Sequence, residues 1–120
     1  MPQPNIALKV RYPTGKICFI DIQGDITLAA ENALMEAYTQ ATTAGVKDIV
    51  FNFAQLSYMN SSGIGLLVTL LIRARRQNQR LLACNLTEHY RQIFELTRLN
   101  EAITIYDTEE DVLRAIPVVR

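Results

Sequence analysis

The sequence predicts a single α/β domain built on a mixed, mostly parallel sheet, with a β-hairpin at its start and about four helices. Its 120 residues suit one domain with one core, so we expect residues 1–120 to form that domain. Hydrophobic residues make up 49% of the chain and charged residues 20%, which is typical of a globular protein. Strand and helix patterns alternate after the hairpin, which favours parallel strands joined by right-handed crossovers.

The hairpin is predicted from two short strands at residues 6–10 and 17–22. In the first, aliphatic residues alternate with other residues, as in a strand at the edge of a sheet. The second is rich in β-branched and aromatic side chains. Residues 13–15, Pro-Thr-Gly, supply the turn between them, and Gly24 ends the second strand.

A helix is predicted next, from residue 28 or 29 to about residue 43, with Thr27 as its N-cap and Gly45 as its stop signal. Four residues at helical spacing would face the core: Leu34, Ala37, Tyr38 and Ala41. The following strand, residues 48–53, is apolar almost throughout, as expected of a central strand covered by helices. Residues 54–60 are expected to form a loop.

Two more strands and two more helices complete the prediction. The strands are expected at residues 81–84 and 103–106, where short apolar runs occur. Thr87 is the predicted N-cap of a helix that extends to about residue 98. Thr108, with an acidic residue three positions later, imitates a capping box and opens a last helix through about residue 116.

The stretch from residue 56 to 76 runs from a polar loop into the most apolar helix-length segment of the chain. Ser61 stands at the junction, so we expect it to be accessible at a helix N-terminus, where the dipole favours anions. Four residues share one face and would pack on the sheet, with Ile72 widening that face: Ile64, Leu67, Val68 and Leu71. Leu66 projects to the opposite side. Either another element covers it or it belongs to a docking surface beside Ser61, and we predict the docking surface.

Charge and composition argue against several kinds of partner. Twelve acidic and twelve basic residues give a formal net charge of zero, which argues against an electrostatic hold on nucleic acid or on an anionic membrane. Four arginines gather near one helix end, where cations suit the dipole: Arg73, Arg75, Arg76 and Arg80. No segment is long and apolar enough for membrane insertion. We expect a cytoplasmic protein in which Cys18 and Cys84 are reduced core residues.

The chain lacks the residue sets that common catalytic and metal sites need. Its one histidine, His89, is expected on the surface of a helix, and no metal or other cofactor is expected. Three asparagines stand at strand ends where a receiver domain would hold an acidic cluster for Mg²⁺: Asn52, Asn60 and Asn85. Ser61 lacks the Gly-x-Ser-x-Gly setting of a hydrolase nucleophile. We therefore expect a protein that is not an enzyme.

Residues 60–65, Asn-Ser-Ser-Gly-Ile-Gly, resemble the signature of the STAS domain family (sulfate transporter and anti-sigma-factor antagonist). The family pattern is a buried strand, a short loop and then Asp-Ser-Ser/Thr-Gly-Leu/Ile-Gly. Residues 24–27, Gly-Asp-Ile-Thr, resemble the family's Gly-Glu-Leu-Asp turn more weakly. The element order matches over nearly the whole chain. The residues that we assign to the motif and to partner binding are Asp25, Thr27, Asn60, Ser62, Gly63, Ile64, Gly65 and Leu66.

The resemblance implies a bacterial anti-sigma-factor antagonist, which regulates transcription by binding a partner protein. In such antagonists a kinase-like, ATP-binding anti-sigma factor phosphorylates the first serine of the motif, and Ser61 stands at that position here. The unphosphorylated antagonist binds the anti-sigma factor and frees the sigma factor, and a phosphatase resets the phosphorylated form. Ser62 is expected to be a helix-capping residue. The protein is expected to be a monomer or a weak dimer.

Two departures from the family pattern bear on this switch. Asn60 and Thr27 each stand where the family usually has Asp. If those carboxylates help to present the serine to the kinase, phosphorylation here would be slow or absent. Asn60 can still cap the helix, so the fold should not change. The alternative function is a STAS interaction or scaffold subunit that is never phosphorylated, in stress signalling or associated with a transporter.

Overall fold

The computed structural model describes residues 5–116, which form a five-stranded mixed sheet in the order β1-β2-β3-β4-β5. Strands β1 and β2 form the antiparallel hairpin, and the remaining neighbours are parallel. The strands are β1 (Ile6–Thr14), β2 (Ile17–Ile26), β3 (Asp48–Met59), β4 (Arg80–Cys84) and β5 (Thr104–Tyr106). The predicted fold class, an α/β domain with a hairpin and a mostly parallel sheet, is confirmed.

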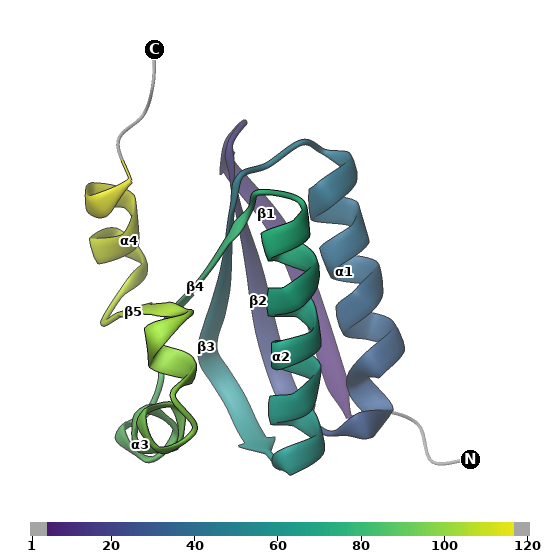
Figure 1. Ribbon diagram of the computed structural model, residues 1–120, viewed down its shortest axis with the longest axis vertical. Helices are drawn as coiled ribbons and strands as arrows, with labels where there is room; N and C mark the ends of the chain where they lie inside the picture. The colour runs from purple at the N-terminus through teal and green to yellow at the C-terminus, as the bar shows by residue number, and fades with distance from the viewer. Residues whose placement is uncertain (1–4, 117–120) are drawn as a thin grey trace.

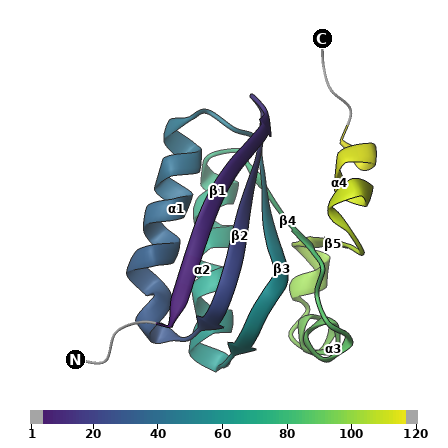
Figure 2. The same ribbon diagram turned by 180° about the vertical axis from the view of Figure 1, so that it is seen from behind.

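Four α-helices and two short 3-10 helices cover this sheet. They are α1 (Glu31–Thr43), α2 (Ser61–Arg76), α3 (Glu88–Leu96) and α4 (Glu109–Ala115), with η1 (Leu28–Ala30) and η2 (Leu99–Glu101). Helices α1 and α2 lie side by side on one face of the sheet (Figure 1). Helix α3 packs into the same apolar layer, whereas α4 packs against the other face, which is the side nearer the viewer in Figure 2. Among residues 5–116, no helix combines the length and hydrophobicity that a membrane span needs.

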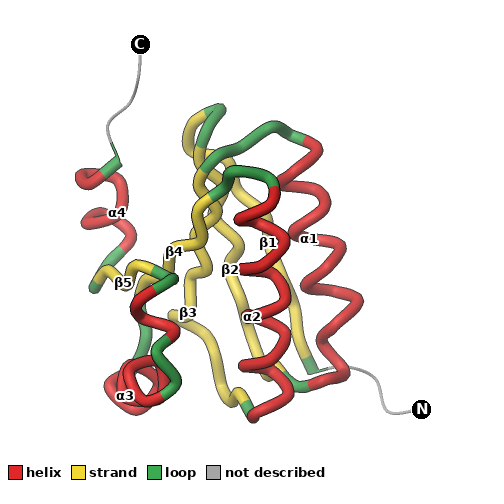
Figure 3. Tube along the Cα trace, in the orientation of Figure 1, coloured by secondary structure: helices red, strands yellow, loops and turns green. Residues whose placement is uncertain are grey.

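Strand β3 is longer than the sequence predicted. Residues 54–60 were expected to be a loop, but β3 continues through Met59, and Figure 3 shows it reaching almost to the start of α2. Its pairing with β4 stops at Asn52, while its pairing with β2 continues to Met59 with two shifts of register. Side chains in this extension are mostly exposed, so no apolar run marked it as a strand. The Met59 amide donates a hydrogen bond to the Tyr90 hydroxyl at 2.9 Å.

The start of α1 also differs from the prediction. The α-helix begins at Glu31, because residues 28–30 form η1 instead of its first turn. Thr27 lies at the N-cap position of η1 but accepts no capping hydrogen bond. Gly45 follows the helix with a left-handed φ of 81°, which suits the predicted stop. The four residues predicted to face the core are all buried: Leu34, Ala37, Tyr38 and Ala41.

Apolar side chains form one core on each face of the sheet. The larger core lies between the sheet and helices α1, α2 and α3, and the smaller one lies under α4. Cys18 belongs to the larger core and Cys84 to the smaller, and both are free thiols, as predicted. Burial raises the pKa of Cys18 to about 11 and that of Cys84 to about 12. Neither thiol is therefore a reactive thiolate at neutral pH.

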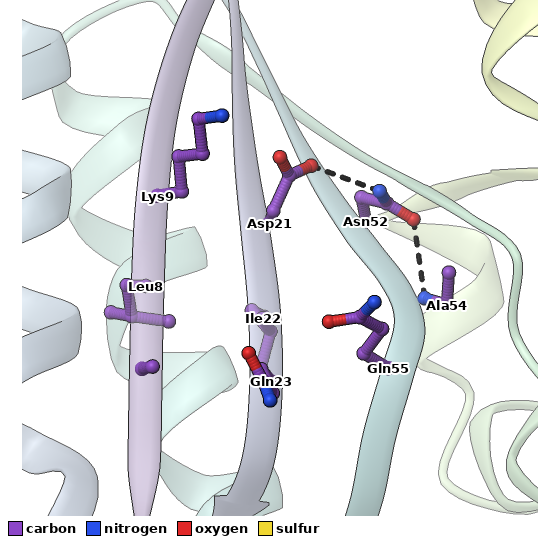
Figure 4. Close-up of a pocket in the computed structure, with 9 residues that line it drawn as sticks. Leu8, Lys9, Asp21, Ile22, Gln23, Asn52, Ala54 and Gln55 are labelled. Carbon is purple, nitrogen blue, oxygen red and sulfur yellow. Dashed lines mark hydrogen bonds between the residues drawn. The ribbon is translucent and has the colours of Figure 1, made fainter.

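A polar network links α4 to the face of the sheet that lies opposite α1 and α2. Arg11 donates to Asp21 of β2 at 2.6 and 2.8 Å and to Glu109 of α4 at 2.6 and 3.2 Å. Asn52 donates to Asp21 at 2.9 Å and accepts from the Ala54 amide at 3.1 Å (Figure 4). Asn52 thereby holds β3 at the point where that strand leaves β4. Asp21 and Asn52 line a pocket, but their hydrogen-bonding capacity is largely used within the protein.

Candidate functional site

The candidate site is centred on the first turn of α2. Ser61 is the first residue of the helix and is exposed, as predicted. Asn60 is the N-cap: its side-chain oxygen accepts a hydrogen bond from the Gly63 amide at 2.9 Å. Ser62 was expected to be a capping residue, and this is wrong, because it lies in the first turn while Asn60 occupies the cap. Within residues 5–116 the Ser61 hydroxyl has no hydrogen-bond partner, so it faces solvent unengaged.

The electrostatics of this turn favour an anion. Four backbone N–H groups at a helix start lack partners within the helix, and the dipole places partial positive charge there. The first turn of α2 contains no acidic residue that would offset this charge. A phosphate on Ser61 would therefore meet a favourable local field.

The end of β2 supports the start of α2. A Cβ atom added to Gly63 would lie 2.0 Å from the Ile26 carbonyl oxygen, so only glycine fits at this close approach. The Asn60 amide donates to the same carbonyl oxygen at 3.3 Å. Asp25 and Thr27 flank Ile26 in the chain, which places both beside the motif although neither forms a hydrogen bond to it. Asp25 instead accepts a hydrogen bond from Asn5 at 3.0 Å.

The orientation predicted for α2 about its own axis was only partly right: Leu67 and Leu71 are buried as expected, but the buried face is turned towards Leu66 and Leu70. Leu66 is only 5% exposed and belongs to the core, so it does not line a docking surface. Ile64, expected in the core, is only partly buried. Val68 and Ile72, expected to face the sheet, are 37% and 49% exposed. The helix is apolar on almost every side, so periodicity alone left its rotation open, and the Gly63 contact with β2 fixes it.

An exposed face of α2 therefore runs from the serine towards the middle of the helix. It consists of Ser61, Gly65, Val68 and Ile72, which fall within a narrow sector at 100° per residue; we call this set the α2 face. Leu28, 63% exposed on η1, adds an apolar side chain from an element that packs against α2. No sequence pattern marked Leu28 as part of this surface, and Val68 and Ile72 were expected in the core, although the spacing of four, three and four residues along α2 was visible.

Gly65 is the one position of the α2 face that has no side chain. Nothing lies within 4 Å of the place where its Cβ would be, in contrast with Gly63. An exposed glycine inside a helix costs about 1 kcal/mol relative to alanine. Within residues 5–116 no neighbouring atom requires a glycine at position 65, so packing inside the domain does not explain the missing side chain.

Comparisons with known proteins match this arrangement. A family model described as STAS domain matches residues 8–112. An anti-sigma-B factor antagonist of Staphylococcus aureus is 25% identical over 91 residues, which cover 76% of this chain and 84% of that protein. The fold is shared with the unphosphorylated anti-sigma factor antagonist SpoIIAA, with a TM-score of 0.71 and 24% identity over 92% of this chain and 100% of the other. An anti-sigma factor antagonist from Mycobacterium paratuberculosis gives a TM-score of 0.77 at 19% identity, covering 97% and 98% of the two chains.

Proposed function

Because the chain belongs to the STAS domain family, we propose that it is an anti-sigma-factor antagonist whose binding is switched off by phosphorylation of Ser61. The observation that carries the proposal is the exposed, unengaged Ser61 hydroxyl at the start of α2, on the same helix face as the exposed side chains of Val68 and Ile72. The partner would be a kinase-like, ATP-binding anti-sigma factor, with a phosphatase for the return step. The protein would act in the cytoplasm as a non-enzymatic regulator and as a monomer or weak dimer, without contact to nucleic acid or membrane.

Relatives support the proposal. The Staphylococcus aureus protein carries the name anti-sigma-B factor antagonist, and SpoIIAA has been solved both unphosphorylated and in its phosphorylated form. Residues 60–65, Asn-Ser-Ser-Gly-Ile-Gly after a buried strand, resemble the family signature whose first serine is phosphorylated, which supports the proposal that Ser61 is the modified residue. The capped helix start presents that serine to solvent.

The docking surface we propose is the α2 face together with Leu28. Val68, Ile72 and Leu28 offer apolar area that a partner can cover. Gly65 leaves helix backbone bare between Ser61 and Val68, so a partner element can approach closely there. A partner on this face would account for the exposed glycine, which the isolated domain does not.

Phosphorylation would then act on the interface and spare the fold. A phosphate adds about −1.5 to −2 charges at pH 7. At the N-terminus of α2 this charge is stabilising by about 0.3–1 kcal/mol. In a docked complex the phosphate must lose water beside Val68 and can meet like charge, which can cost several kcal/mol. Since about 1.4 kcal/mol is tenfold in affinity, a modest clash suffices to release the partner.

The deciding experiment is incubation with each kinase-like anti-sigma factor from the same genome and ATP, followed by mass spectrometry. We expect phosphate on Ser61 and none on the Ser61→Ala variant. Ser62→Ala is the matched control, because Ser62 is also an exposed hydroxyl in the first turn of α2. Ser61→Ala should bind constitutively, and Ser61→Asp should bind poorly with almost unchanged stability. Phosphate only at other positions, or none with any candidate, would contradict the switch.

The second candidate is an interaction or scaffold subunit that is never phosphorylated. It is favoured by Asn60, which stands where the family usually has Asp and is engaged as the cap of α2. Asn60→Asp separates the two functions because Asp can also cap. If the variant is phosphorylated and the natural chain is not, the natural protein belongs to the scaffold class.

A further inference from the structure

A second candidate site lies at the opposite end of α2 from Ser61. A pocket of about 230 Å³ lies between the last turns of α2 and strands β4 and β5. Its apolar lining includes Leu71, Leu81 and Ala102, and its polar lining includes Arg75, Arg80 and Thr104. Helix α2 has 16 residues and spans about 24 Å, so this pocket is far from Ser61, although Ile72 of the α2 face adjoins Leu71 of the pocket lining; Figure 1 shows the two ends of α2.

Two polar side chains of this pocket are held by buried partners. The Arg80 Nε atom donates to the Asp48 carboxylate at 2.7 Å, and Asp48 is almost fully buried. Gln79 accepts from the Tyr38 hydroxyl at 2.8 Å and donates to Thr42 at 3.2 Å. These bonds orient the Gln79 side chain and the Nε end of Arg80, although the Arg80 side chain is 67% exposed, and such orientation reduces the entropy lost on binding.

Positive charge gathers around the pocket although the chain as a whole is neutral. The cations at this end of the molecule are Lys16, Lys47, Arg73, Arg75, Arg76 and Arg80; the acidic residues there are Asp48, which pairs with Arg80, and Glu101, which precedes Ala102. Backbone hydrogen bonds from Arg80 to Lys47 (2.8 Å) and from Lys47 to Lys16 (3.0 Å) bring three of them to neighbouring strand starts. In the part of the chain from 5 to 116, only Arg80 of this set has an ion-pair partner.

The dipole of α2 explains only part of this cluster. The last turn of α2 contains Arg73, Arg75 and Arg76, and cations there stabilise the helix. Lys16, Lys47 and Arg80 lie outside the helix, at the starts of neighbouring strands. A helix C-terminus also repels anions, so any anion bound here must be held by the guanidinium groups themselves.

We propose that this pocket binds a small organic anion: a phosphate or carboxylate attached to a compact apolar or aromatic group. Arg75 and Arg80 would hold the anion, because a guanidinium pairs with either oxyanion through two parallel hydrogen bonds. Leu71, Leu81 and Ala102 would cover the apolar group. An enclosed cavity of about 150 Å³ accepts benzene, so the pocket is large enough for one ring. The surrounding cations raise the local concentration of such anions.

The test is an NMR titration of the ¹⁵N-labelled full chain with phenyl phosphate and with benzoate, which distinguish the two oxyanions. Inorganic phosphate and phenol serve as probes for the anion alone and the ring alone. We expect phenyl phosphate or benzoate to shift the amides of Leu71, Ala102 and Thr104 and to bind more tightly than either half probe. A ligand that shifts no amide in this pocket, or inorganic phosphate binding as tightly as phenyl phosphate, would overturn the proposal.

Two variants test the pocket lining. Arg75→Gln should weaken binding about tenfold, the value of one charged hydrogen bond. Arg76→Gln removes the same charge one residue later, outside the pocket lining, and should change binding far less. Equal losses of affinity in the two variants would indicate diffuse attraction to a basic surface and would refute a binding site in this pocket. Ala102→Leu fills the pocket without changing charge, so it should block the ring-bearing ligands; unchanged binding by a folded Ala102→Leu protein would also refute it.

Discussion

Gly63 of α2 lies so close to Ile26 of β2 that a Cβ atom on the glycine would fall 2.0 Å from the Ile26 carbonyl oxygen. The Asn60 amide bonds to that same oxygen at 3.3 Å. These two contacts join the end of β2 to the start of α2. They decide which side of α2 faces the sheet and therefore which residues accompany Ser61 on the surface.

Gly63→Ala should destabilise the fold. The added methyl group meets backbone on one side and helix on the other, so neither can yield cheaply. Overpacking of this kind costs about 1–3 kcal/mol and sometimes more. Urea denaturation measures the change in the free energy of unfolding. An unchanged midpoint would show that α2 and β2 are less tightly joined than described.

Gly65→Ala should have the opposite effect on the isolated protein. Its Cβ would meet nothing within 4 Å, so the variant should gain about 1 kcal/mol from improved helix propensity. The methyl group would stand on the α2 face, so binding to the anti-sigma factor should weaken. The two readouts are a thermal melt and an affinity measurement. Stabilisation with full affinity would remove Gly65 from the docking surface.

Leu66 and Val68 should separate stability from binding. Leu66→Ala should cost about 2–5 kcal/mol, because a buried leucine is truncated. Val68→Ala should change the free energy of unfolding by no more than about 0.5 kcal/mol, since surface substitutions are usually small. Val68→Ala and Ile72→Ala should instead weaken partner binding. A loss of stability in Val68→Ala similar to that of Leu66→Ala would contradict the orientation of α2.

Asp21 should make stability depend on pH in the acid range. Hydrogen bonds from Arg11, and secondarily from Asn52, hold the pKa of Asp21 below its usual value in the folded state. The stabilisation is therefore complete above the unfolded pKa of about 3.9 and is lost as the pH falls through the folded value. Asp21→Asn should lose stability less steeply than the natural protein below about pH 4 in urea titrations. Equal steepness would contradict the role assigned to Asp21.

Local chemistry made much of the fold predictable. Three helices start with a capping side chain that accepts a hydrogen bond from a backbone amide three residues later, so the cap can be recognised in the local sequence. The structure has this bond at all three caps: Asn60, Thr87 and Thr108. The inner face of α1 was predictable because its other side is polar. The rotation of α2 about its axis was not predictable, because the helix carries apolar side chains on almost every side. The contact that decides the rotation, Gly63 with Ile26, joins residues far apart in the chain.

The second half of β3 could not be recognised as a strand from the sequence, for a related reason. A strand paired on both sides and covered on both faces appears as an apolar run, and residues 48–53 do so. Beyond Asn52 the strand keeps only β2 as a neighbour and most side chains reach solvent. Its sequence then resembles a loop. The position of Ser61 was still predicted correctly, because the glycines and the cap mark where α2 begins.

The extension of β3 has one further consequence, for solubility. A strand that extends beyond its neighbour has unpaired backbone N–H and C=O groups at its edge. A strand from another molecule can pair with these groups, which is a common start of aggregation. Here the Ala54 amide is taken by the Asn52 side chain, and the Met59 amide by the Tyr90 hydroxyl. The first and last residues of the extension therefore have their amides engaged within the same chain. The extension therefore carries β3 to the start of α2 with fewer free amides along its edge for a strand of another molecule to bind.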